Sequence, residues 1–302
     1  MKRYLIAVFC LALGPFSRAQ IISTNISVAD AFVRSIDPTN NYGGAGALAV
    51  SGLIATNAIG QQEGLLDSFM RFDVSSAISN FDGAYGPGRW VIADATLILF
   101  EQGMPNNPIF NRGVGPFEVQ WIATNSWLEG TGNPNLPTTD GIVWNDEPHV
   151  LNSNVDELLG TFVNGGTDGV VNATLALASR FIGEISTGGL VSLYFTAPTN
   201  SQVGFSFHSH NFVDPTQWPF LQLTALPMPQ ITSLVISGTD ARIGVLTGIG
   251  ITNIVEYSST LASNSWTVLT NLIGTGGSAV AIDSGVATQP KRFYRVHLTT
   301  SP

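Results

Sequence analysis

Apolar and polar residues alternate along two stretches of the chain, residues 68–76 and residues 92–100. In the first stretch, Met70 and Phe72 stand on either side of Arg71. Successive side chains of a strand point to opposite faces of a sheet, so a period of two residues is typical of a strand with one buried and one wet face. Each stretch therefore predicts a half-buried β-strand.

Similar short apolar runs recur along the whole chain between clusters of Gly, Asn, Pro and Thr. Helical periodicity is weak. Only residues 156–162 and 173–182 fit a short helix, and the second segment fits a strand as well. Many short strands separated by turn signals favour an all-β sandwich or barrel.

Two prolines mark the clearest domain boundary. Pro227 and Pro229 follow a predicted strand at 220–224 and precede another at 231–236. A proline pair between two strands is typical of a short linker. The sequence therefore predicts a first domain of residues 20–226, a linker of residues 227–229 and a second domain of residues 230–302.

Residues 1–19 have the three parts of a secretory signal peptide. Lys2 and Arg3 form the basic start, residues 4–13 form the apolar core, and small residues precede Gln20. The apolar core is too short to span a bilayer, which disfavours the alternative of a membrane anchor. We expect a secreted or extracellular protein, with the periplasm as an alternative, and no membrane insertion.

Acidic residues outnumber basic ones, 21 to 12, which gives a formal charge of −9. Removing the predicted signal takes away Lys2, Arg3 and Arg18 and no acidic residue, so −9 becomes −12. This charge excludes nucleic acid and anionic membranes as partners. The single cysteine, Cys10, lies in the predicted signal, so the exported chain is expected to be stabilised by core burial without disulfides.

The longest irregular stretch of the first domain, residues 129–149, is the expected position of a functional loop. A sugar site on a β scaffold needs an aromatic face for the apolar side of the ring and polar groups for its hydroxyls. The candidate ligand-binding residues are Trp144, Asn145, Asp146, Glu147 and Trp218. In the alternative interpretation, both tryptophans anchor loops in the core.

Asp30 and Asp37 are the candidate ligands of a structural calcium ion, with Asp73 and Asp94 as further carboxylates. Calcium suits an acidic, exported chain because it takes carboxylate and carbonyl oxygens. The alternative is turn chemistry, since an aspartate before a proline, as at Asp37, forms a turn without any metal. No cofactor follows from the sequence with certainty.

His208 and His210 are two residues apart and therefore share one face of a strand. Two such imidazoles, with Asp214 as a third ligand, form the alternative metal site, one for a transition metal. A wet polar face without a metal explains the same spacing, and we favour that interpretation.

Residues 20–226 carry a series of motifs in a fixed order, at 29–34, 41–43, 70–75, 92–97, 127–129, 205–209 and 219–223. In this order and spacing, the region resembles the DNRLRE domain family, β-sandwich modules of secreted bacterial proteins related to carbohydrate-binding modules. The resemblance implies a jelly-roll-like antiparallel β-sandwich that binds a polysaccharide or a cell-surface glycan. His210 stands where the family has an acidic residue.

The second domain has three motifs, at 255–261, 265–269 and 292–296. They resemble a small β module that ends many secreted proteins of environmental bacteria. The resemblance implies a fibronectin-like architecture and no known chemistry.

The chain lacks a Gly-x-Ser-x-Gly elbow, a His-Glu-x-x-His motif, a phosphate-binding glycine loop and a cysteine nucleophile outside the predicted signal. We therefore expect no catalytic residues and a non-catalytic, glycan-binding protein. The second hypothesis is a structural or adhesive extracellular protein without a small ligand. A polysaccharide lyase or hydrolase is the third, with Glu118 and either Glu129 or Glu147 as the carboxylate pair.

Overall fold

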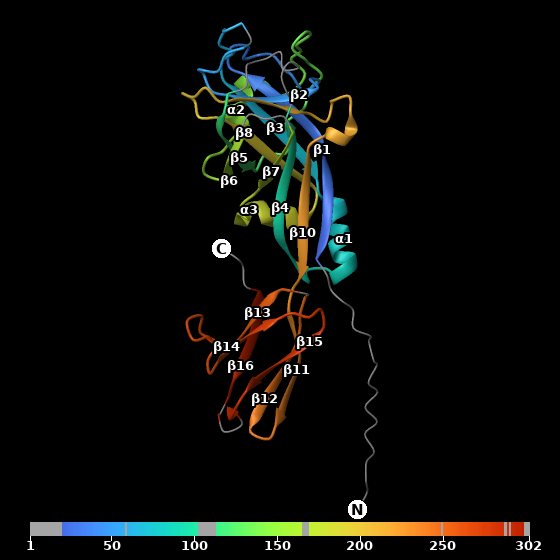
Figure 1. The fold of residues 1–302 in the computed structure, drawn as a ribbon, viewed down its shortest axis with the longest axis vertical. Helices are drawn as coiled ribbons and strands as arrows, with labels where there is room; N and C mark the ends of the chain where they lie inside the picture. The colour runs from blue at the N-terminus through green and yellow to red at the C-terminus, as the bar shows by residue number, and fades with distance from the viewer. Residues whose placement is uncertain are drawn as a thin grey trace, which may run out of the picture. The chain divides into compact units, whose positions relative to one another are not determined.

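The computed structural model describes residues 20–57, 59–101, 113–164, 169–248, 250–286, 289 and 291–298 (Figure 1). The predicted signal peptide lies outside these residues. Strands dominate the described chain and pair antiparallel, so the all-β prediction is confirmed. The chain forms two compact units. The larger unit is Ile22–Pro87 with Ile92–Ala225, and the smaller unit is built on Leu226–Pro302 with Gly88–Val91.

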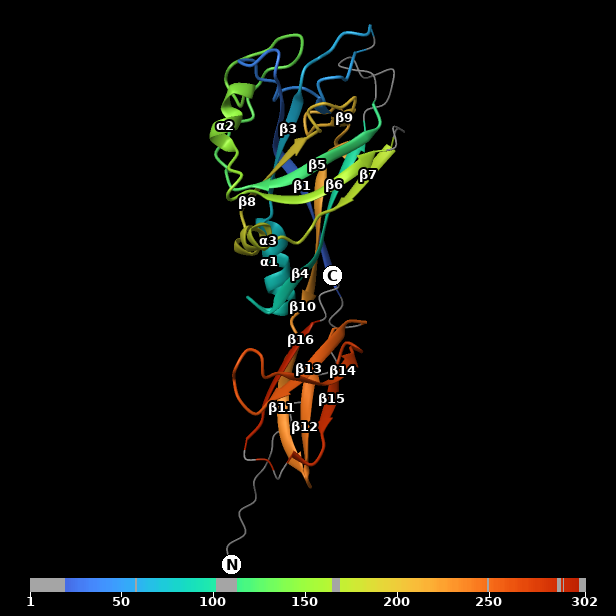
Figure 2. The ribbon, with the colours of Figure 1, turned by 90° about the vertical axis from the view of Figure 1, so that its left-hand side faces the viewer.

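One sheet of ten strands forms the larger unit (Figures 1 and 2). Its strands are β1 (Ile21–Arg34), β2 (Ala47–Ser51), β3 (Leu66–Asp73), β4 (Trp90–Glu101), β5 (Gly115–Ile122), β6 (Glu157–Asn164), β7 (Gly169–Thr174), β8 (Leu190–Thr196), β9 (Gly204–His208) and β10 (Phe220–Pro227). They are hydrogen-bonded in the order β1-β10-β4-β9-β2-β3-β8-β5-β6, and β7 pairs with β4.

An additional pairing of β1 with β3 closes six of these strands into a ring. The two separate sheets of a jelly-roll sandwich are therefore not confirmed. A bulge in β1 makes the closure possible, because the strand bends there. The pairing of β1 with β3 shifts register between Ser27 and Ala29, and Asn25, before the bulge, donates from its amide to the carbonyl oxygen of Leu221 in β10 at 3.0 Å.

Two helices pack against the sheet of the larger unit. Helix α1 (Ser75–Tyr85) buries Ala77, Phe81 and Tyr85, and α3 (Ser179–Thr187) buries Phe181 and Ile185. The alternating pattern at 68–76 ends where α1 begins. The largest fully buried side chains of this unit are phenylalanines and leucines: Phe32, Phe69, Phe72, Phe81, Phe117, Phe181, Phe195, Phe205, Phe207, Leu48 and Leu66.

The sequence-based helix assignments need correction. Of residues 156–162, all but the first fall in strand β6, where Phe117 of β5 packs against Phe162 with ring centroids 6.0 Å apart. Within 173–182, Ala173 belongs to β7, and α3 begins at Ser179. Tertiary packing between strands has overridden weak local periodicity.

The smaller unit consists of two three-stranded sheets, β11-β12-β15 and β14-β13-β16. Its strands are β11 (Gln230–Ser237), β12 (Asp240–Leu246), β13 (Thr252–Ser258), β14 (Thr267–Ile273), β15 (Ser278–Asp283) and β16 (Phe293–Leu298). Its core takes residues from both sheets, including Ile243 of β12, Val255 of β13 and Ala281 of β15. Because both sheets contribute to one core, they face each other.

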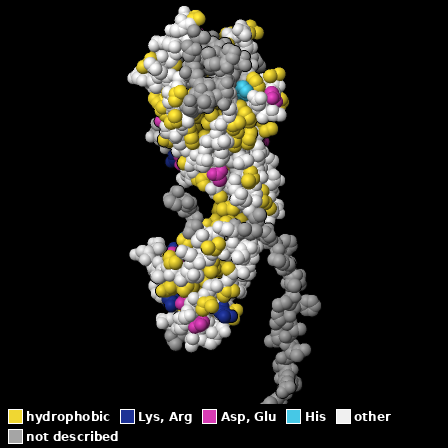
Figure 3. All heavy atoms as spheres, viewed as in Figure 1, with side chains coloured by type: hydrophobic (Ala, Val, Ile, Leu, Met, Phe, Trp, Pro, Cys, Tyr) yellow, Lys and Arg dark blue, Asp and Glu magenta, His cyan; other side chains and the backbone are white. Residues whose placement is uncertain are grey.

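The surface is poor in charge. Charged residues make up 11% of the chain, and on the face seen in Figure 3 they lie scattered among uncharged polar and hydrophobic side chains. Within the described residues, no helix has both the length and the apolar character needed to cross a membrane.

Candidate functional site

Residues 123–151, here named the covering loop, lie over one face of strand β3. The loop ends in a short 3-10 helix, η1 (Trp144–Asp146), and helix α2 (Glu147–Val150). Phe69 of β3 packs against Trp127 with ring centroids 5.8 Å apart. Arg71 donates hydrogen bonds of 2.8 and 2.9 Å to the carbonyl oxygens of Asn125 and Trp127. These contacts fix the start of the loop on the sheet.

Asn41 ties the two arms of the covering loop together. It is fully buried, and its amide nitrogen donates to the carbonyl oxygens of Glu129 at 2.7 Å and Ile142 at 2.8 Å. Its amide oxygen accepts from the backbone N–H groups of Gly43 and Gly132. One side chain thereby satisfies four backbone groups in a segment without regular strands.

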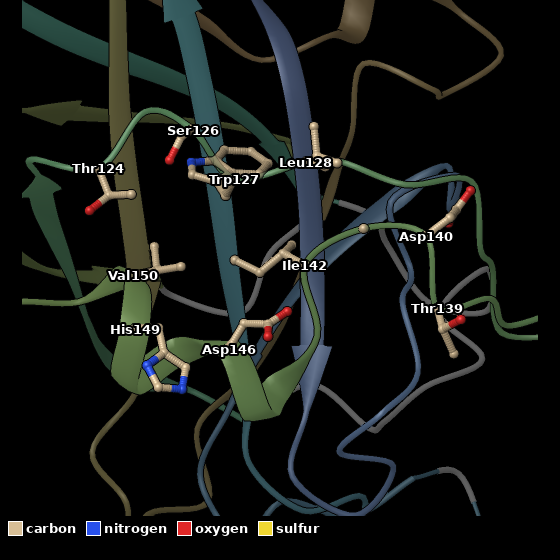
Figure 4. Close-up of a pocket in the computed structure, with 11 residues that line it drawn as sticks. Thr124, Ser126, Trp127, Leu128, Thr139, Asp140, Ile142, Asp146, His149 and Val150 are labelled. Carbon is tan, nitrogen blue, oxygen red and sulfur yellow. The ribbon is translucent and has the colours of Figure 1, made fainter.

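A pocket of about 450 Å³ opens in the covering loop (Figure 4). It is lined by Thr124, Ser126, Trp127, Leu128, Thr139, Asp140, Gly141, Ile142, Asp146, His149 and Val150. Trp127, Ile142 and Val150 are buried and form apolar walls. Figure 4 shows Asp146 and His149 on the helical turn and Ser126 on the segment that leads to Trp127. Polar groups from separate segments thus converge on one concavity.

Two carboxylates of the pocket are held by local hydrogen bonds. Asp140 accepts from the hydroxyls of Thr131 at 2.7 Å and Thr138 at 2.5 Å, and these bonds lower the pKa of Asp140 to about 2. Oδ2 of Asp146 accepts from the backbone N–H of Val143 at 3.1 Å. Asp140 is therefore ionised at neutral pH, and both carboxylates are held in fixed positions.

The four predicted residues of segment 144–147 have different surroundings. Trp144 is half-buried and packs against the core beneath the loop, as the anchor interpretation predicted. Asn145 is exposed, and its backbone N–H donates to the carbonyl oxygen of Pro38 at 3.1 Å. Asp146 lines the pocket, whereas Glu147 is buried. Asp146 alone of the four therefore contributes to the pocket.

Glu147 belongs to a buried polar cluster with Asp67 and Tyr194. The Tyr194 hydroxyl donates to Oδ2 of Asp67 at 2.8 Å. Burial raises the pKa of Asp67 to about 6, and burial together with the negative charge of Asp67 raises the pKa of Glu147 to about 9. Two adjacent buried carboxyl groups share one proton because both cannot ionise cheaply. Burial thus raises the pKa of both carboxyl groups, and the pair holds a proton at neutral pH.

A second cluster joins Asp30, Glu129 and His210 from three distant parts of the chain. Each residue offers one possible ligand atom, and these three atoms lie within 4.8 Å of one another. Asp30 is fully buried, and its Oδ2 accepts from the Ser27 hydroxyl at 3.1 Å and from the His210 backbone N–H at 2.9 Å. Asn211 donates to Oε1 of Glu129 at 2.8 Å.

Charges within this cluster act on one another. Burial lowers the pKa of His210, but the contact with Asp30 and the charges of Asp30 and Glu129 outweigh burial, so the pKa is raised overall. Burial raises the pKa of Glu129, and the nearby charge of His210 offsets part of this. The ring nitrogens of His210 lie 3.2 Å from Oδ2 of Asp30 and 3.4 Å from Oε1 of Glu129.

Trp218 lies beside this second cluster and does not line the pocket. Its indole N–H donates to the carbonyl oxygen of Phe212 at 2.8 Å, and its ring meets that of His210 edge-on at 6.1 Å between centroids. All six tryptophans of the chain are buried or half-buried. Trp144 and Trp218 therefore do not form an exposed aromatic platform.

The surroundings of Asp37 do not fit calcium. Its Oδ2 already accepts from Arg34 at 2.8 Å and from the Tyr42 hydroxyl at 3.1 Å. A guanidinium in direct contact repels a cation, and calcium needs six to eight oxygen ligands. The surroundings of Asp30 include the imidazole of His210, a nitrogen donor, at 3.2 Å. Asp30 and Asp37 therefore have separate partners, and no described contact joins them.

The remaining metal and catalytic candidates also lie in different environments. His208 stacks on Phe212 with ring centroids 3.6 Å apart, whereas His210 contacts Asp30 and Glu129. Asp214 caps η2 (Pro215–Gln217) by accepting from the Thr216 backbone N–H. The carboxylates proposed for hydrolysis have different neighbours: Glu129 lies in the His210 cluster and Glu147 beside Asp67.

Sequence reasoning missed Asn41, Asp67, Tyr194 and His149 as parts of these sites. Asp67 directly precedes the alternating stretch at 68–76 and lies on a strand that is buried on both faces. A carboxylate at such a position requires a polar partner, so its position in the sequence did indicate a buried polar cluster. The partners come from residues far away in sequence, and a single sequence does not reveal them.

No protein-family profile matches the sequence, and no functionally curated protein is significantly similar to it. The resemblance of residues 20–226 to the DNRLRE family thus stays a prediction. Several solved structures align with low similarity. One is the glycoside hydrolase domain of Endo-D from Streptococcus pneumoniae R6, with 11% identity and a TM-score of 0.18, covering 92% of this chain and 37% of that one.

Two β-glucuronidases align comparably. The enzyme from Lactobacillus rhamnosus has 9% identity and a TM-score of 0.26, with 93% of this chain and 42% of that chain covered. The enzyme from Ruminococcus gnavus has 7% identity and a TM-score of 0.24, with 92% and 43% covered. The chain spans less than half of each of these structures. Alignments with TM-scores this low indicate neither the fold nor the activity of this protein.

Proposed function

We propose that this protein is exported and binds a neutral carbohydrate, without catalysis, in the pocket of the covering loop. The observation that carries the proposal is the lining of the pocket. Apolar walls from Trp127, Ile142 and Val150 accompany hydroxyl, carboxylate and imidazole groups that come from separate segments. Sugars combine apolar C–H faces with many hydroxyls, and a pocket of this composition matches both.

The charge of the site selects the class of sugar. Asp140 and Asp146 both line the pocket, and the chain carries a net charge of −9. Carboxylates accept hydrogen bonds from sugar hydroxyls but repel uronates and sulfated sugars. Neutral glycans are therefore the expected ligands, and polyanionic glycans are the expected non-ligands.

Affinity electrophoresis tests this proposal. The full chain without residues 1–19 is run through gels containing a soluble neutral β-glucan, a xylan or a polyuronate. We expect retardation by at least one neutral polymer and none by the polyuronate. Asp146→Asn and His149→Ala should each weaken binding at least about tenfold, since a hydrogen bond to a charged group contributes about 1.5–3 kcal/mol.

Asp94→Asn, on strand β4, is the matched control for Asp146→Asn, because it also loses a carboxylate that accepts a local hydrogen bond. Relative to its own mobility in a gel without polymer, this control should be retarded as much as the wild type in every gel. Unchanged retardation of both pocket variants would move the binding site elsewhere, and no retardation by any neutral polymer would overturn the proposal.

A structural or adhesive role is the second candidate function. The lack of a fully exposed tryptophan favours it, since an open aromatic platform for a long polysaccharide chain is lacking in the described residues. This alternative predicts that no sugar changes tryptophan fluorescence or the melting temperature. Saturable stabilisation by a neutral oligosaccharide, lost in His149→Ala, would exclude it as the sole function.

A further inference from the structure

We propose that Asp30, Glu129 and His210 bind one divalent transition-metal ion of the zinc class. The three residues come from β1, from the covering loop and from the segment after β9, and their ligand atoms lie within 4.8 Å of one another. One imidazole nitrogen with two carboxylates is a donor set that zinc and its neighbours accept, with water completing the coordination.

An unpartnered buried atom points to a cation at this position. Asp30 is fully buried, and its Oδ1 has no hydrogen-bond partner among the described residues. Leaving a buried carboxylate oxygen unpaired destabilises the folded state, because its hydration is lost without replacement. The other oxygen of Asp30 is already held by Ser27 and by the backbone of His210. A metal ion between the three side chains would satisfy Oδ1.

The competing occupant of the cluster is a proton on His210. A protonated ring would bridge the two carboxylates, since Nδ1 lies 3.2 Å from Oδ2 of Asp30 and Nε2 lies 3.4 Å from Oε1 of Glu129. The charge of Glu129 also acts on Arg71, whose guanidinium donates to carbonyl oxygens of the covering loop. A proton on His210 leaves Oδ1 of Asp30 without a partner, whereas a metal ion would use its lone pair.

Neighbouring groups hold the ligands and leave a path for an ion. Asn211 donates to Glu129 at 2.8 Å, and Trp218 covers the edge of the His210 ring. Such outer contacts orient metal ligands. The side chains of His210 and Glu129 are 19% and 22% exposed, so an ion can reach the site. Calcium is disfavoured, because one of the three ligands is an imidazole nitrogen.

Isothermal titration of the chelator-treated full chain with Zn²⁺ at pH 7.5 tests the site. We expect one ion per chain, no competition from a large excess of Ca²⁺, and a higher melting temperature with Zn²⁺. Glu129→Gln and His210→Gln should each weaken Zn²⁺ binding at least tenfold and abolish the thermal shift. Glu118→Gln on β5 and His297→Gln on β16 are the matched controls, which should bind like the wild type.

Wild-type protein alone provides a second measurement, which does not depend on the folding of a variant. Co²⁺ added in place of Zn²⁺ should give the visible absorption of a site with nitrogen and oxygen ligands, and Zn²⁺ should displace it at one equivalent. The proposal would be overturned if the wild type did not bind Zn²⁺, or if Glu129→Gln and His210→Gln bound Zn²⁺ as tightly as the wild type. Displacement of Zn²⁺ by Ca²⁺ at equal concentration would overturn it as well.

Discussion

Glu147 shows how a buried position changes the chemistry of a residue that resembles a ligand in the sequence. It lies in a run of polar residues beside Trp144, yet its carboxyl group points to Asp67 inside the fold. Burial costs a carboxylate its hydration, so the pair keeps one proton. The Tyr194 hydroxyl donates to Oδ2 of Asp67, and retaining one proton avoids two adjacent negative charges inside the fold.

A pH dependence of stability follows from this pair. The pKa of Glu147 is about 9 in the folded chain against an ordinary value of 4.5, so the folded state binds the proton more tightly than the unfolded state. The contribution to stability is therefore fully present below pH 4.5 and is lost as the pH rises toward 9. We expect the wild-type melting temperature to fall between pH 6 and pH 9.

Glu147→Gln isolates the effect. We expect the glutamine amide to donate to Asp67 without being able to lose a proton. The melting temperature of the variant should therefore fall less than that of the wild type between pH 6 and pH 9. Glu118→Gln is the control and should follow the wild-type curve. Parallel curves for wild type and Glu147→Gln, measured by differential scanning fluorimetry, would contradict the assignment of the proton to this pair.

Asn41 is the residue on which the covering loop depends most. Its side chain makes four hydrogen bonds to backbone groups while fully buried. Asn41→Ala leaves these groups unsatisfied, and we expect a loss of about 3 kcal/mol in the free energy of unfolding. Chemical denaturation measures it, and the exposed Asn135→Ala should change stability by less than about 0.5 kcal/mol. A similar small change in both variants would contradict this role.

At the scale of elements, strand β1 departs most from its sequence pattern. Its first half carries Ile22, Ile26 and Val28 on one face, which alternation predicts to be buried. These side chains are 51%, 50% and 47% exposed, and small polar residues such as Asn25 point inward instead. The Asn25 amide is held by the carbonyl oxygen of Leu221, which gives this inward-pointing polar side chain a partner.

Substituting one exposed and one buried isoleucine tests whether the apolar face of the first half of β1 is exposed. Ile26→Thr keeps a β-branched side chain at an exposed position, so its effect on the free energy of unfolding should stay within about 0.5 kcal/mol. Ile122→Thr places a hydroxyl in the core beneath the covering loop, where we expect a loss above about 2 kcal/mol. Equal losses in denaturant titrations would mean that the first half of β1 is buried as alternation predicts.

Strand content could be predicted from the sequence because it depends on local alternation. Residues 68–73 of the first stretch lie in β3, and residues 92–100 lie in β4. The closed ring and helix α1 could not be predicted in the same way, because α1 begins within the first of these stretches and the ring depends on a bulge in β1. The sites were harder still. Asp30 was recognised as a metal candidate, but its neighbours Glu129 and His210 are brought to it only by the fold.

At the scale of the molecule, each compact unit buries hydrophobic residues of its own among the residues that the structure describes. The core of the larger unit includes Leu97, and that of the smaller unit includes Ile243, both fully buried. The linking segment is short, since β10 ends at Pro227 and β11 begins at Gln230. Because each unit buries side chains of its own strands, we expect each unit to unfold in its own cooperative transition.

Two thermal transitions are therefore expected in differential scanning calorimetry. Leu97→Ala and Ile243→Ala each remove buried methyl groups and should cost about 3 kcal/mol in their own unit. Each variant should lower one transition by at least about 5 °C and leave the other within about 1 °C, because distant sites act additively. A single transition that both variants shift alike would mean that the two cores unfold as one cooperative structure.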